Sequence, residues 1–471
     1  MLIFKHAFLL SLVSYTVSAA SSEESGYVIT LKPGLSDRQA ESHYGWIKSQ
    51  LHVAEVAKYH INTFRAYSGK FDQQAINKIK SRPEVQTVEL DVMMTSSSVM
   101  KPKIQKQKER TPLNTELMMT SAPSNKEITQ KNAPWGLSRL SSLKTPGFFG
   151  KKSYDYTYHS SAGEGTWAYV LDDGINLNHQ DFGRRVTLGA ICYNDTCTTP
   201  SRHRAANAYH GTHVAGTIAG SKYGVAKKAK IVDVRVMWDF PNVPDKDKPR
   251  VLKQLGFLST TLNGLTWAFN DMRDKHRIGK SVINLSLGPS CPDEKKTFDE
   301  CKDFAKSYAV KYISQALFKA GILVIAAAGN QGLPAEWRGH HGQDGVLTVG
   351  AIDEKGNEAP FSNYGEGVDI LAPGVGILSA DFEDVHGGRL MSGTSMATPH
   401  VTGLALYLMA LEGITDPGLL KKRILDLAVD DGKVLSKGVE GRGKGKLRKP
   451  PTTKRRAYNG IQKGKPRSRT G

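Results

Sequence analysis

Short, uninterrupted apolar runs alternate with helix-patterned segments through the middle of this chain. A strand that is buried on both faces reads as a continuous apolar run, whereas a half-exposed strand alternates apolar with polar residues. The alternation therefore predicts an α/β fold, with a doubly wound, mostly parallel sheet and helices on both faces. Functional residues of such sheets lie beyond the carboxyl ends of the strands. The apolar runs are 167–171, 231–236, 282–287, 322–328 and 346–351, and the helical segments include 257–272 and 303–319.

A smaller unit precedes this region. The order of its expected strands and helices predicts a small α+β unit within residues 21–93. Residues 94–131 then lose hydrophobic periodicity and are rich in Ser, Lys, Gln, Pro and Thr, which is typical of an exposed, cleavable linker. The large α/β domain is therefore expected at 132–471. The pattern of the small unit is a strand at 27–31, a helix from 36, a strand at 59–64, a helix near 73–80 and a strand at 85–92.

The first twenty residues have the pattern of a secretory signal peptide. Lys5 precedes an apolar stretch at 7–17, and Val17-Ser18-Ala19 suits a cleavage site of small residues. The alternative, a buried N-terminal helix, is disfavoured because the apolar stretch is short and ends in small polar residues. No later apolar run approaches the ~18 residues of a membrane span. We therefore expect a secreted, extracellular protein with no membrane contact.

Secretion would allow the four cysteines to form disulfides. Asn194 begins an Asn-Asp-Thr acceptor for N-glycosylation between the first two cysteines. Asn284 begins a second match, Asn-Leu-Ser, but it lies in a predicted apolar strand. We therefore expect a glycan at Asn194 and not at Asn284. The local pairings that loop-closure entropy favours are Cys192 with Cys197 and Cys291 with Cys301.

The C-terminal part of the chain is strongly basic. Of a net charge of +19, residues 433–471 carry 14 Lys or Arg against the single acid Glu440. Such a segment attracts polyanions such as nucleic acid or an acidic cell-wall polymer, but a solvated loop or tail is the commoner explanation. Polyanion contact through 433–471 is therefore one hypothesis for this segment.

Three segments supply the groups that serine-based acyl transfer needs: a hydroxyl, an imidazole that takes its proton, and a carboxylate that orients the imidazole. Asp172 follows an apolar strand and begins Asp-Asp-Gly, which taken alone is usually only a turn. His210 begins His-Gly-Thr-His-Val-Ala-Gly-Thr, whose small residues allow a helix to pack closely. Ser395, in Gly-Thr-Ser-Met-Ala-Thr-Pro-His, heads an apolar helix, and a role as a helix cap would not explain the whole octet.

Together these segments resemble the subtilisin family, which has the same Asp, His, Ser order along the chain. Residues 132–460, from Asn-Ala-Pro-Trp-Gly-Leu at 132 to Ala-Tyr-Asn-Gly at 457, are similar to the proteinase K branch, mostly fungal secreted enzymes. Residues 26–93 resemble the family's propeptide, an intramolecular chaperone and inhibitor with a ferredoxin-like fold. The resemblance implies a zymogen that cuts its own linker and needs no cofactor for its chemistry. We expect it to be a monomer.

By this resemblance Ser395 is the nucleophile, His210 the general base and then acid, and Asp172 the carboxylate that orients His210. Asn330, in Ala-Ala-Gly-Asn after an apolar strand, is the oxyanion-hole donor, although an asparagine in that place is ordinarily a turn former. The implied activity is that of a serine endopeptidase acting on proteins and peptides. The rival hypothesis is a catalytically inactive protein that binds a polyanion on the same scaffold.

Substrate is expected to add to the enzyme as an antiparallel strand. Because the residues implied for the primary pocket are small and uncharged, we expect broad specificity with a preference for apolar or aromatic residues before the cut bond. A dibasic enzyme of the kexin type would need acids there, and nothing in the sequence places Asp293 or Glu294 in the pocket. The resemblance places Ser286, Leu287, Gly288 and Gly256 along the substrate and Ala327, Ala328 and Gly329 in the primary pocket.

The resemblance also implies one structural calcium ion. Its ligands would be the carboxylate of Asp369 and the backbone carbonyls of Asp344 and Val346, which are the hard oxygen donors that calcium prefers. Asp369 is equally well explained as a hydrogen-bonded carboxylate at the end of a strand. The sequence leaves these two interpretations open.

Two features depart from the family pattern. Asp173 follows the proposed catalytic aspartate, where the family usually has Ser or Thr. A second carboxylate there either alters the pKa values of the site or faces away from it. The basic stretch at 441–456 resembles an insertion, and we expect it to be a loop if a closing strand follows it.

Overall fold

The computed structural model of the chain describes residues 25–53, 55–96, 126–143, 153–193, 196–199, 207–239, 254–289, 307–335, 345–430 and 452–461. Within these residues the largest sheet has ten strands in the order β10-β9-β11-β8-β14-β16-β17-β18-β22-β21. Neighbouring strands from β9 to β22 are parallel, and the two end strands are antiparallel to their neighbours, which confirms the predicted sheet. The bounds are β8 Trp167–Asp172, β9 Val186–Tyr193, β10 Thr196–Thr198, β11 Lys230–Arg235, β14 Ser281–Leu285, β16 Leu323–Ala327, β17 Val346–Ile352, β18 Ile370–Pro373, β21 Val429–Asp430 and β22 Arg455–Arg456.

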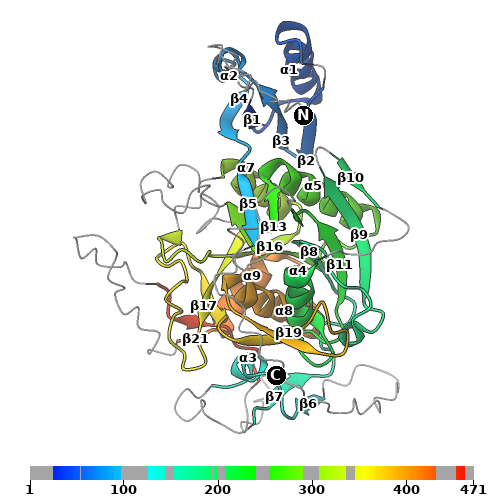
Figure 1. Ribbon diagram of the computed structural model, residues 1–471, viewed down its shortest axis with the longest axis vertical. Coiled ribbons are helices and arrows are strands. Elements are labelled where there is room, and N and C mark those ends of the chain that lie inside the picture. The colour runs from blue at the N-terminus through cyan, green and yellow to red at the C-terminus, as the bar shows by residue number, and fades with distance from the viewer. Residues whose placement is uncertain are drawn as a thin grey trace, which may run out of the picture.

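Helices cover both faces of this sheet (Figure 1). Alternate residues of β8 show the two faces, because side chains along a strand point in opposite directions. Ala168 and Val170 belong to the core that includes α4 and α8, whereas Tyr169 and Leu171 belong to the core that includes α5 and α7. Continuous apolar strands thus separate two buried cores. The helices are α4 Tyr209–Ala219, α5 Leu258–Asp274, α7 Tyr308–Lys319, α8 Thr394–Glu412 and α9 Pro417–Leu427, which packs on α8.

The N-terminal unit is a four-stranded sheet, β2-β3-β1-β4, with two helices. One predicted strand was wrong: residues 59–64 belong to two strands, because Asn62, with a φ of 50°, begins a two-residue turn between them. The predicted strand at 85–92 ends earlier, at Leu90. The resulting order is strand, helix, two strands, helix, strand, which is an α+β unit with one strand more than predicted. The bounds are β1 Ser25–Leu31, α1 Asp37–Gln50, β2 Ala57–Ile61, β3 Phe64–Phe71, α2 Gln73–Lys80 and β4 Val85–Leu90.

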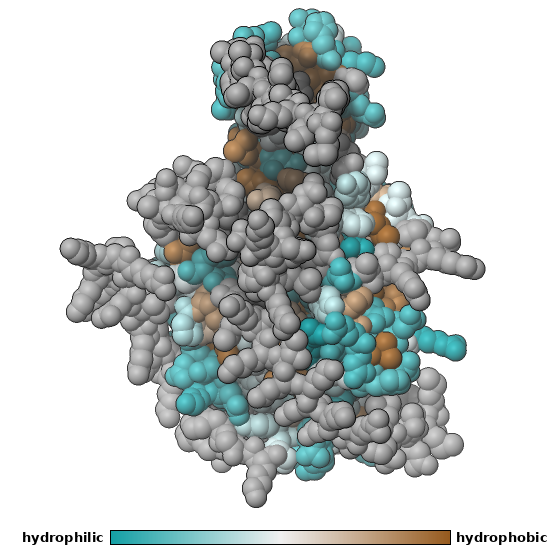
Figure 2. Space-filling view, viewed as in Figure 1, coloured by the Kyte–Doolittle hydropathy of each residue, from teal (hydrophilic) through white to brown (hydrophobic). Residues whose placement is uncertain are grey.

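The N-terminal sheet packs with one face on α1 and α2 and with the other on α5 and α7 of the large unit. Tyr59 and Ile61 of β2 are fully buried in the same apolar cluster as Leu262 and Ile313. Figure 2 shows hydrophobic residues at the neck between the units, while the outer surface of the N-terminal unit is mostly hydrophilic. The two units therefore share an apolar interface.

Two carboxylates strengthen this interface at the N-termini of α5 and α7. Asp91 accepts hydrogen bonds from the backbone N–H of Ser259, at 2.8 Å, and from its hydroxyl, at 2.7 Å. Glu89 accepts one from the backbone N–H of Ala309, at 2.7 Å. The first N–H groups of a helix have no acceptor within the helix and carry partial positive charge. The N-terminal unit thus supplies acceptors to helix N–H groups of the large unit, in addition to the cap that Ser307 gives α7.

The predicted linker is partly ordered. Its first residues form β5 (Met93–Ser96), and residues near its end form β6 (Glu127–Gln130), which pairs antiparallel with β7 (Tyr156–His159). Residues at both ends of the predicted linker therefore belong to strands, and its cleavage stays a prediction. A short helix, α3 (Trp135–Leu140), follows β6.

One predicted disulfide is present, and it joins Cys192 of β9 to Cys197 of β10. Strand β22, formed by Arg455 and Arg456, pairs with β18, so the last two residues of the basic stretch at 441–456 themselves form the closing strand. Arg456 of that strand is fully buried and donates hydrogen bonds to the carbonyls of Arg139 and Ser142.

No helix among the described residues is long and apolar enough to cross a membrane.

Several predictions concern residues outside the described ranges. These are the signal peptide, the glycosylation site at Asn194, the pairing of Cys291 with Cys301, Asp344, and the parts of the linker and of the basic segment at 97–125, 433–451 and 462–471. They stay predictions.

Candidate active site

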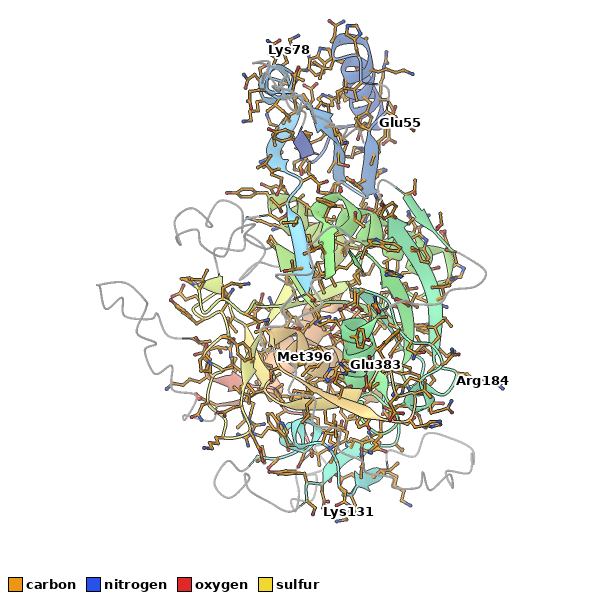
Figure 3. All side chains as sticks on the ribbon, in the orientation of Figure 1. Glu55, Lys78, Lys131, Arg184, Glu383 and Met396 are labelled. Atoms are coloured by element: carbon orange, nitrogen blue, oxygen red, sulfur yellow. A yellow bond between two sulfur atoms is a disulfide. The ribbon has the colours of Figure 1, made fainter. Side chains whose placement is uncertain are left out.

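The four predicted catalytic residues lie at or just after strand ends and at helix starts. Asp172 is the last residue of β8, Asn330 follows β16 by three residues, and His210 and Ser395 are the second residues of α4 and α8. The exposed fractions of all four are 5% or less. Helices α4 and α8 pack against each other, and Met396, beside Ser395, lies near the centre of the large unit in Figure 3.

Asp172 holds one edge of the His210 ring. Nδ1 of His210 lies 2.8 Å from Oδ1 and 3.0 Å from Oδ2 of Asp172. A carboxylate accepts hydrogen bonds only, so Nδ1 carries the proton and the lone pair of the neutral ring is on Nε2. Nε2 is buried and has no hydrogen-bond partner among the described residues. The ring is thus oriented with a basic nitrogen available for a reactant.

Asp173 turns away from the ring and toward the start of α4. Its Oδ2 accepts the backbone N–H of His210 at 3.0 Å, and its Oδ1 accepts that of Gly211 at 2.7 Å. Burial, together with the neighbouring charge of Asp172, raises the pKa of Asp173 well above its ordinary value. A glycine is required at position 211, because a Cβ there would lie 2.3 Å from the carbonyl oxygen of Gly174.

Ser395 lies in the first turn of α8, where the helix dipole is positive. Its side-chain oxygen is 3.7 Å from the sulfur of Met396. The hydroxyl of Ser286 donates to the carbonyl of Ser395 at 3.2 Å, and the side chain of Asn284 donates to Ser286 at 2.9 Å. Asn284 also accepts from Thr402 of α8, at 2.8 Å. These hydrogen bonds fix the main chain of Ser395 to the end of β14. The full burial of Asn284 agrees with the expectation that Asn284 carries no glycan.

Asn330 is held by its oxygen and not by its nitrogen. Oδ1 accepts hydrogen bonds from the backbone N–H of Thr394, at 2.8 Å, and from its hydroxyl, at 2.9 Å. Nδ2 is buried and has no partner among the described residues. A buried N–H donor without an acceptor is costly, and such donors cluster at functional sites. The geometry therefore presents a fixed donor beside Ser395.

Two supporting residues were missed from the sequence. Thr394 lies within the quoted serine octet, and its hydrogen bonds to Asn330 were not anticipated. Asn363 donates to the carbonyl of Ala328 at 2.9 Å and accepts the backbone N–H groups of Gln331 and Leu333, at 3.1 and 3.0 Å. It therefore shapes the loop that carries Asn330. No local signal identified Asn363, because its partners lie about 30 residues away in sequence.

The strand β5 from the N-terminal part of the chain lies between two predicted substrate-binding strands. It is antiparallel to β13 (Gln254–Phe257) and to β15 (Leu287–Pro289). Gly256 pairs with Met94, and Gly288 pairs with Thr95. Strand β13 also pairs with the short β12 (Trp238–Asp239). An extended segment is therefore held by main-chain hydrogen bonds on both sides, which do not depend on side-chain identity.

The three residues predicted for the primary pocket follow one another at the end of β16. Ala327 and Ala328 are buried, and Gly329, with a φ of 103°, donates its backbone N–H to the hydroxyl of Thr394 at 3.1 Å. Gly329 thus contacts the same threonine that Asn330 contacts. Ser286 and Leu287 are fully buried, and Leu287 pairs with Ser96 of β5.

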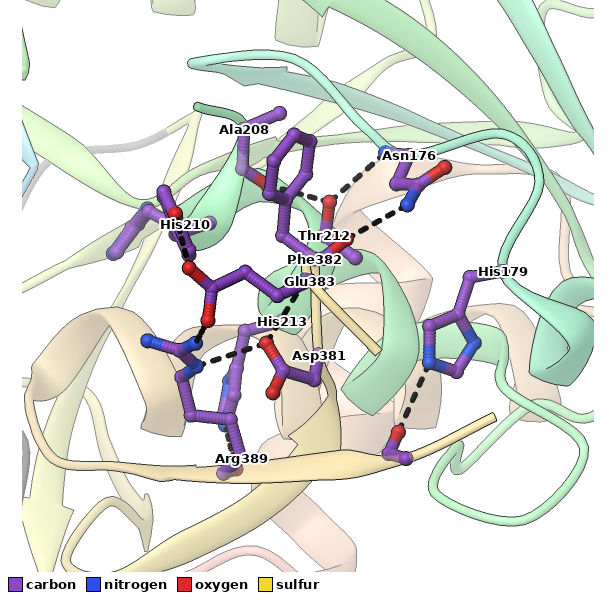
Figure 4. Close-up of polar contacts among 12 residues, drawn as sticks. Asn176, His179, Ala208, His210, Thr212, His213, Asp381, Phe382, Glu383 and Arg389 are labelled. Carbon is purple, nitrogen blue, oxygen red and sulfur yellow. Dashed lines mark hydrogen bonds and ion pairs between the residues drawn. The ribbon is translucent and has the colours of Figure 1, made fainter. Parts of the chain in front are cut away.

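A hairpin of β19 (Ile377–Ala380) and β20 (Gly388–Met391) packs against α4 on another side (Figure 4). His213 contacts the carbonyls of Ile377 and Arg389 at 2.9 and 3.0 Å, and burial lowers the pKa of His213 to about 3. In Figure 4, Arg389 bridges Asp381 and Glu383 at 2.9 and 2.6 Å. A neutral, fixed His213 therefore supports the helix and does not act as a second base.

Two of the three residues predicted to bind calcium, Val346 and Asp369, contact a lysine instead. The Nζ of Lys421 in α9 donates a hydrogen bond to the carbonyl of Val346 at 2.6 Å and lies 3.5 Å from Oδ1 of Asp369. Oδ2 of Asp369 accepts the backbone N–H of Thr348 at 2.8 Å. The described residues also contain no cluster of three or more His, Cys, Asp or Glu suited to a metal. The two described donors, Val346 and Asp369, are thus arranged around an ammonium group and do not fit calcium as folded.

Comparisons with known proteins agree with this geometry. A model described as the subtilase family matches residues 163–449, and one described as peptidase inhibitor I9 matches residues 26–97. Alkaline protease 1 of Aspergillus flavus is 34% identical over 433 residues, covering 89% of this chain and 90% of that protein. Subtilisin-like proteinase Mp1 of Magnaporthiopsis poae is 36% identical over 429 residues, covering 88% of each. The crystal structure of a cold adapted subtilisin-like serine proteinase aligns with a TM-score of 0.53 and 29% identity, covering 70% of this chain and all of that one.

Proposed function

The chain belongs to the subtilase family of serine endopeptidases, and on that premise we propose that Asp172, His210, Ser395 and Asn330 are its catalytic residues. One observation carries the proposal. The two polar atoms that the reaction would use, Nε2 of His210 and Nδ2 of Asn330, are buried without a partner, while the other polar atoms of those side chains are hydrogen bonded.

The reaction follows from these positions. The oxygen of Ser395 attacks the carbonyl carbon of the scissile bond while Nε2 of His210 takes the hydroxyl proton. The carbonyl electron pair moves onto oxygen, and Nδ2 of Asn330 with the backbone N–H of Ser395 donates to that oxyanion. When the intermediate collapses, the C–N bond breaks and the amine takes the proton from His210. Water then repeats the sequence on the acyl-enzyme.

We further propose that substrates bind in the place of β5. The pairing of β5 with Gly256 and Gly288 supports a substrate strand held between β13 and β15 by main-chain bonds. The small, uncharged Ala327, Ala328 and Gly329 favour an apolar or aromatic side chain before the cut bond, with broad specificity elsewhere. While β5 stays in place, the N-terminal unit acts as an inhibitor.

Maturation would remove that inhibitor by cleavage within residues 94–131, after removal of the signal peptide during secretion. The hydrogen bonds that Asp91 and Glu89 accept from the backbone N–H groups of α5 and α7 keep the N-terminal unit on these helices until it dissociates or is degraded. The product is an extracellular endopeptidase of broad specificity.

Substitution Ser395→Ala tests the proposal. The secreted variant should keep an intact linker, hydrolyse no peptide substrate and fail to react with a fluorophosphonate probe. The wild-type chain should cut its linker, hydrolyse peptides and react with the probe. Ser153→Ala is the matched control, because Ser153 is an exposed serine that precedes β7 in the large unit and would stay in the mature chain. A Ser395→Ala protein that still hydrolyses peptides would overturn the assignment. Mass spectrometry of the wild-type product would identify the cleavage site.

A further inference from the structure

The surroundings of Lys421 form an oxygen-lined cation site. Val346 begins β17 and Asp369 directly precedes β18, so adjacent parallel strands present their N-terminal ends together. The carbonyl of Val346 and Oδ1 of Asp369 both face the ammonium group, at 2.6 and 3.5 Å. The Lys421 and Asp369 side chains are only 18% and 17% exposed. Their contact is therefore largely shielded from water.

Asp369 is fixed in this position by the main chain of the neighbouring strand. Its backbone N–H donates to the carbonyl of Thr348 at 3.0 Å, and its Oδ2 accepts the N–H of Thr348 at 2.8 Å. One carboxylate oxygen is thus committed to the sheet, and the other is left to face a cation. A carboxylate oxygen and a backbone carbonyl are donors that hard cations such as calcium share with an ammonium group.

The ammonium comes from a helix that is itself anchored. Asp416 caps the start of α9, where its side chain accepts the backbone N–H of Leu419 at 2.8 Å, and the fully buried Ile424 lies on the same helix. Lys421 therefore reaches the strands from a fixed backbone. Its neighbour Lys422 is 70% exposed and pairs with Asp426 in its own helix. The two lysines differ in environment although they are adjacent in sequence.

We propose that the ammonium of Lys421 is the resident cation of this site and that it excludes calcium. A divalent ion bound to Asp369 and Val346 would lie next to the ammonium, where like charges repel strongly because little water screens them. Since the lysine is part of the chain, the site stays filled at any calcium concentration. The local stability of β17, β18 and α9 is then independent of calcium.

Thermal unfolding with and without calcium tests this inference. All variants carry Ser395→Ala, so that self-digestion does not disturb the measurement and the result does not depend on the proposed catalysis. The Ser395→Ala protein with Lys421 intact should unfold at the same temperature in EDTA and in millimolar calcium. Lys421→Met should unfold several degrees lower in EDTA and recover in calcium, because a ligand that binds only the native state raises its stability. If that variant is unfolded in EDTA, folding on addition of calcium is the equivalent result.

Three controls separate a cation site from a simple ion pair. Lys421→Arg keeps the charge and should stay indifferent to calcium. Lys422→Met removes the exposed neighbour and should also stay indifferent. Adding Asp369→Asn to Lys421→Met should abolish the recovery in calcium. The inference is overturned if the protein with Lys421 intact is stabilised by calcium and Asp369→Asn removes that effect, or if Lys421→Met gains no response to calcium.

Discussion

Oδ2 of Asp173 accepts the backbone N–H of His210 at 3.0 Å, so adjacent aspartates hold the same histidine, one by its main chain and the other by its ring. Asp173 faces away from the ring, and burial together with the charge of Asp172 raises its pKa, so both interpretations open from the sequence apply. It is still linked to the site, because it fixes the start of α4 against the end of β8. Asp173 is thus a positioning residue in the proposed mechanism.

Asp173→Ala should lower kcat more than it raises KM. The substitution removes both acceptors at the start of α4, which loosens the His210 backbone and lowers the free energy of unfolding by about 1–2 kcal/mol. Asp173→Asn keeps one acceptor and should lie between the wild type and Asp173→Ala. Steady-state kinetics and denaturant unfolding would measure these changes.

Asp416→Ala is the matched control for this prediction, because it removes a comparable cap from α9 away from the site. It should reduce stability similarly and leave kcat unchanged. Equal kcat values in Asp173→Ala and Asp416→Ala would show that the cap of α4 has no part in positioning His210.

Asn330→Asp should lower kcat about 100- to 1000-fold with little change in KM, the usual effect of removing one oxyanion-hole donor. Aspartate keeps an oxygen to accept from Thr394 but loses the Nδ2–H donor, so the local fold is preserved. Asn363→Asp offers a comparison, because it removes a donor to Ala328 that does not face the reacting atoms. A similar kcat for wild type and Asn330→Asp would exclude Nδ2 as an oxyanion donor.

Inhibition by the N-terminal unit should weaken as pH rises from 4.5 toward 7. Burial raises the pKa of Glu89 from 4.5 to about 7 in the complex, outweighing its hydrogen bonds to the start of α7. Below pH 4.5 Glu89 is protonated both bound and unbound. Between the two pKa values binding takes up a proton, so affinity falls by up to about tenfold per pH unit. Above 7 Glu89 is ionised in both states and this dependence ends.

Inhibition constants of the separately produced N-terminal unit, measured across this pH range, would check the prediction. Glu89→Gln should flatten the dependence. Glu41→Gln, at an exposed residue of α1 that pairs with Lys58, should leave it intact. An identical pH profile for wild type and Glu89→Gln would assign the dependence to other groups.

Replacing Cys192 and Cys197 by alanine should lower the free energy of unfolding by about 2 kcal/mol, the loop-entropy value for so short a loop. The cystine lies at the edge of the ten-stranded sheet, between β9 and the end strand β10, so kcat should not change. Denaturant unfolding in the Ser395→Ala background would measure the loss. A reduced kcat in the active double variant would contradict this separation of stability from catalysis.

Much of the fold was predictable because its determinants are local. The apolar run at 167–171 became β8, Trp167–Asp172, since a strand buried on both faces needs nothing polar within it. The positions of His210 and Ser395 at helix starts likewise follow from the motifs around them. Where a local signal is weak the prediction was wrong, as at residues 59–64, where one left-handed asparagine divides two strands.

The sequence by itself determined the layered α/β fold, the small N-terminal unit and the four proposed catalytic residues, because hydrophobic period and motif are properties of neighbouring residues. Only the tertiary structure decided where Asp173 points, that β5 lies between Gly256 and Gly288, and that Lys421 reaches Val346 and Asp369. These contacts join residues from 37 to 193 positions apart, counting from Asp173 to His210 and from Thr95 to Gly288. Such distant residues meet only through the packing of whole strands and helices, and no short segment encodes that packing.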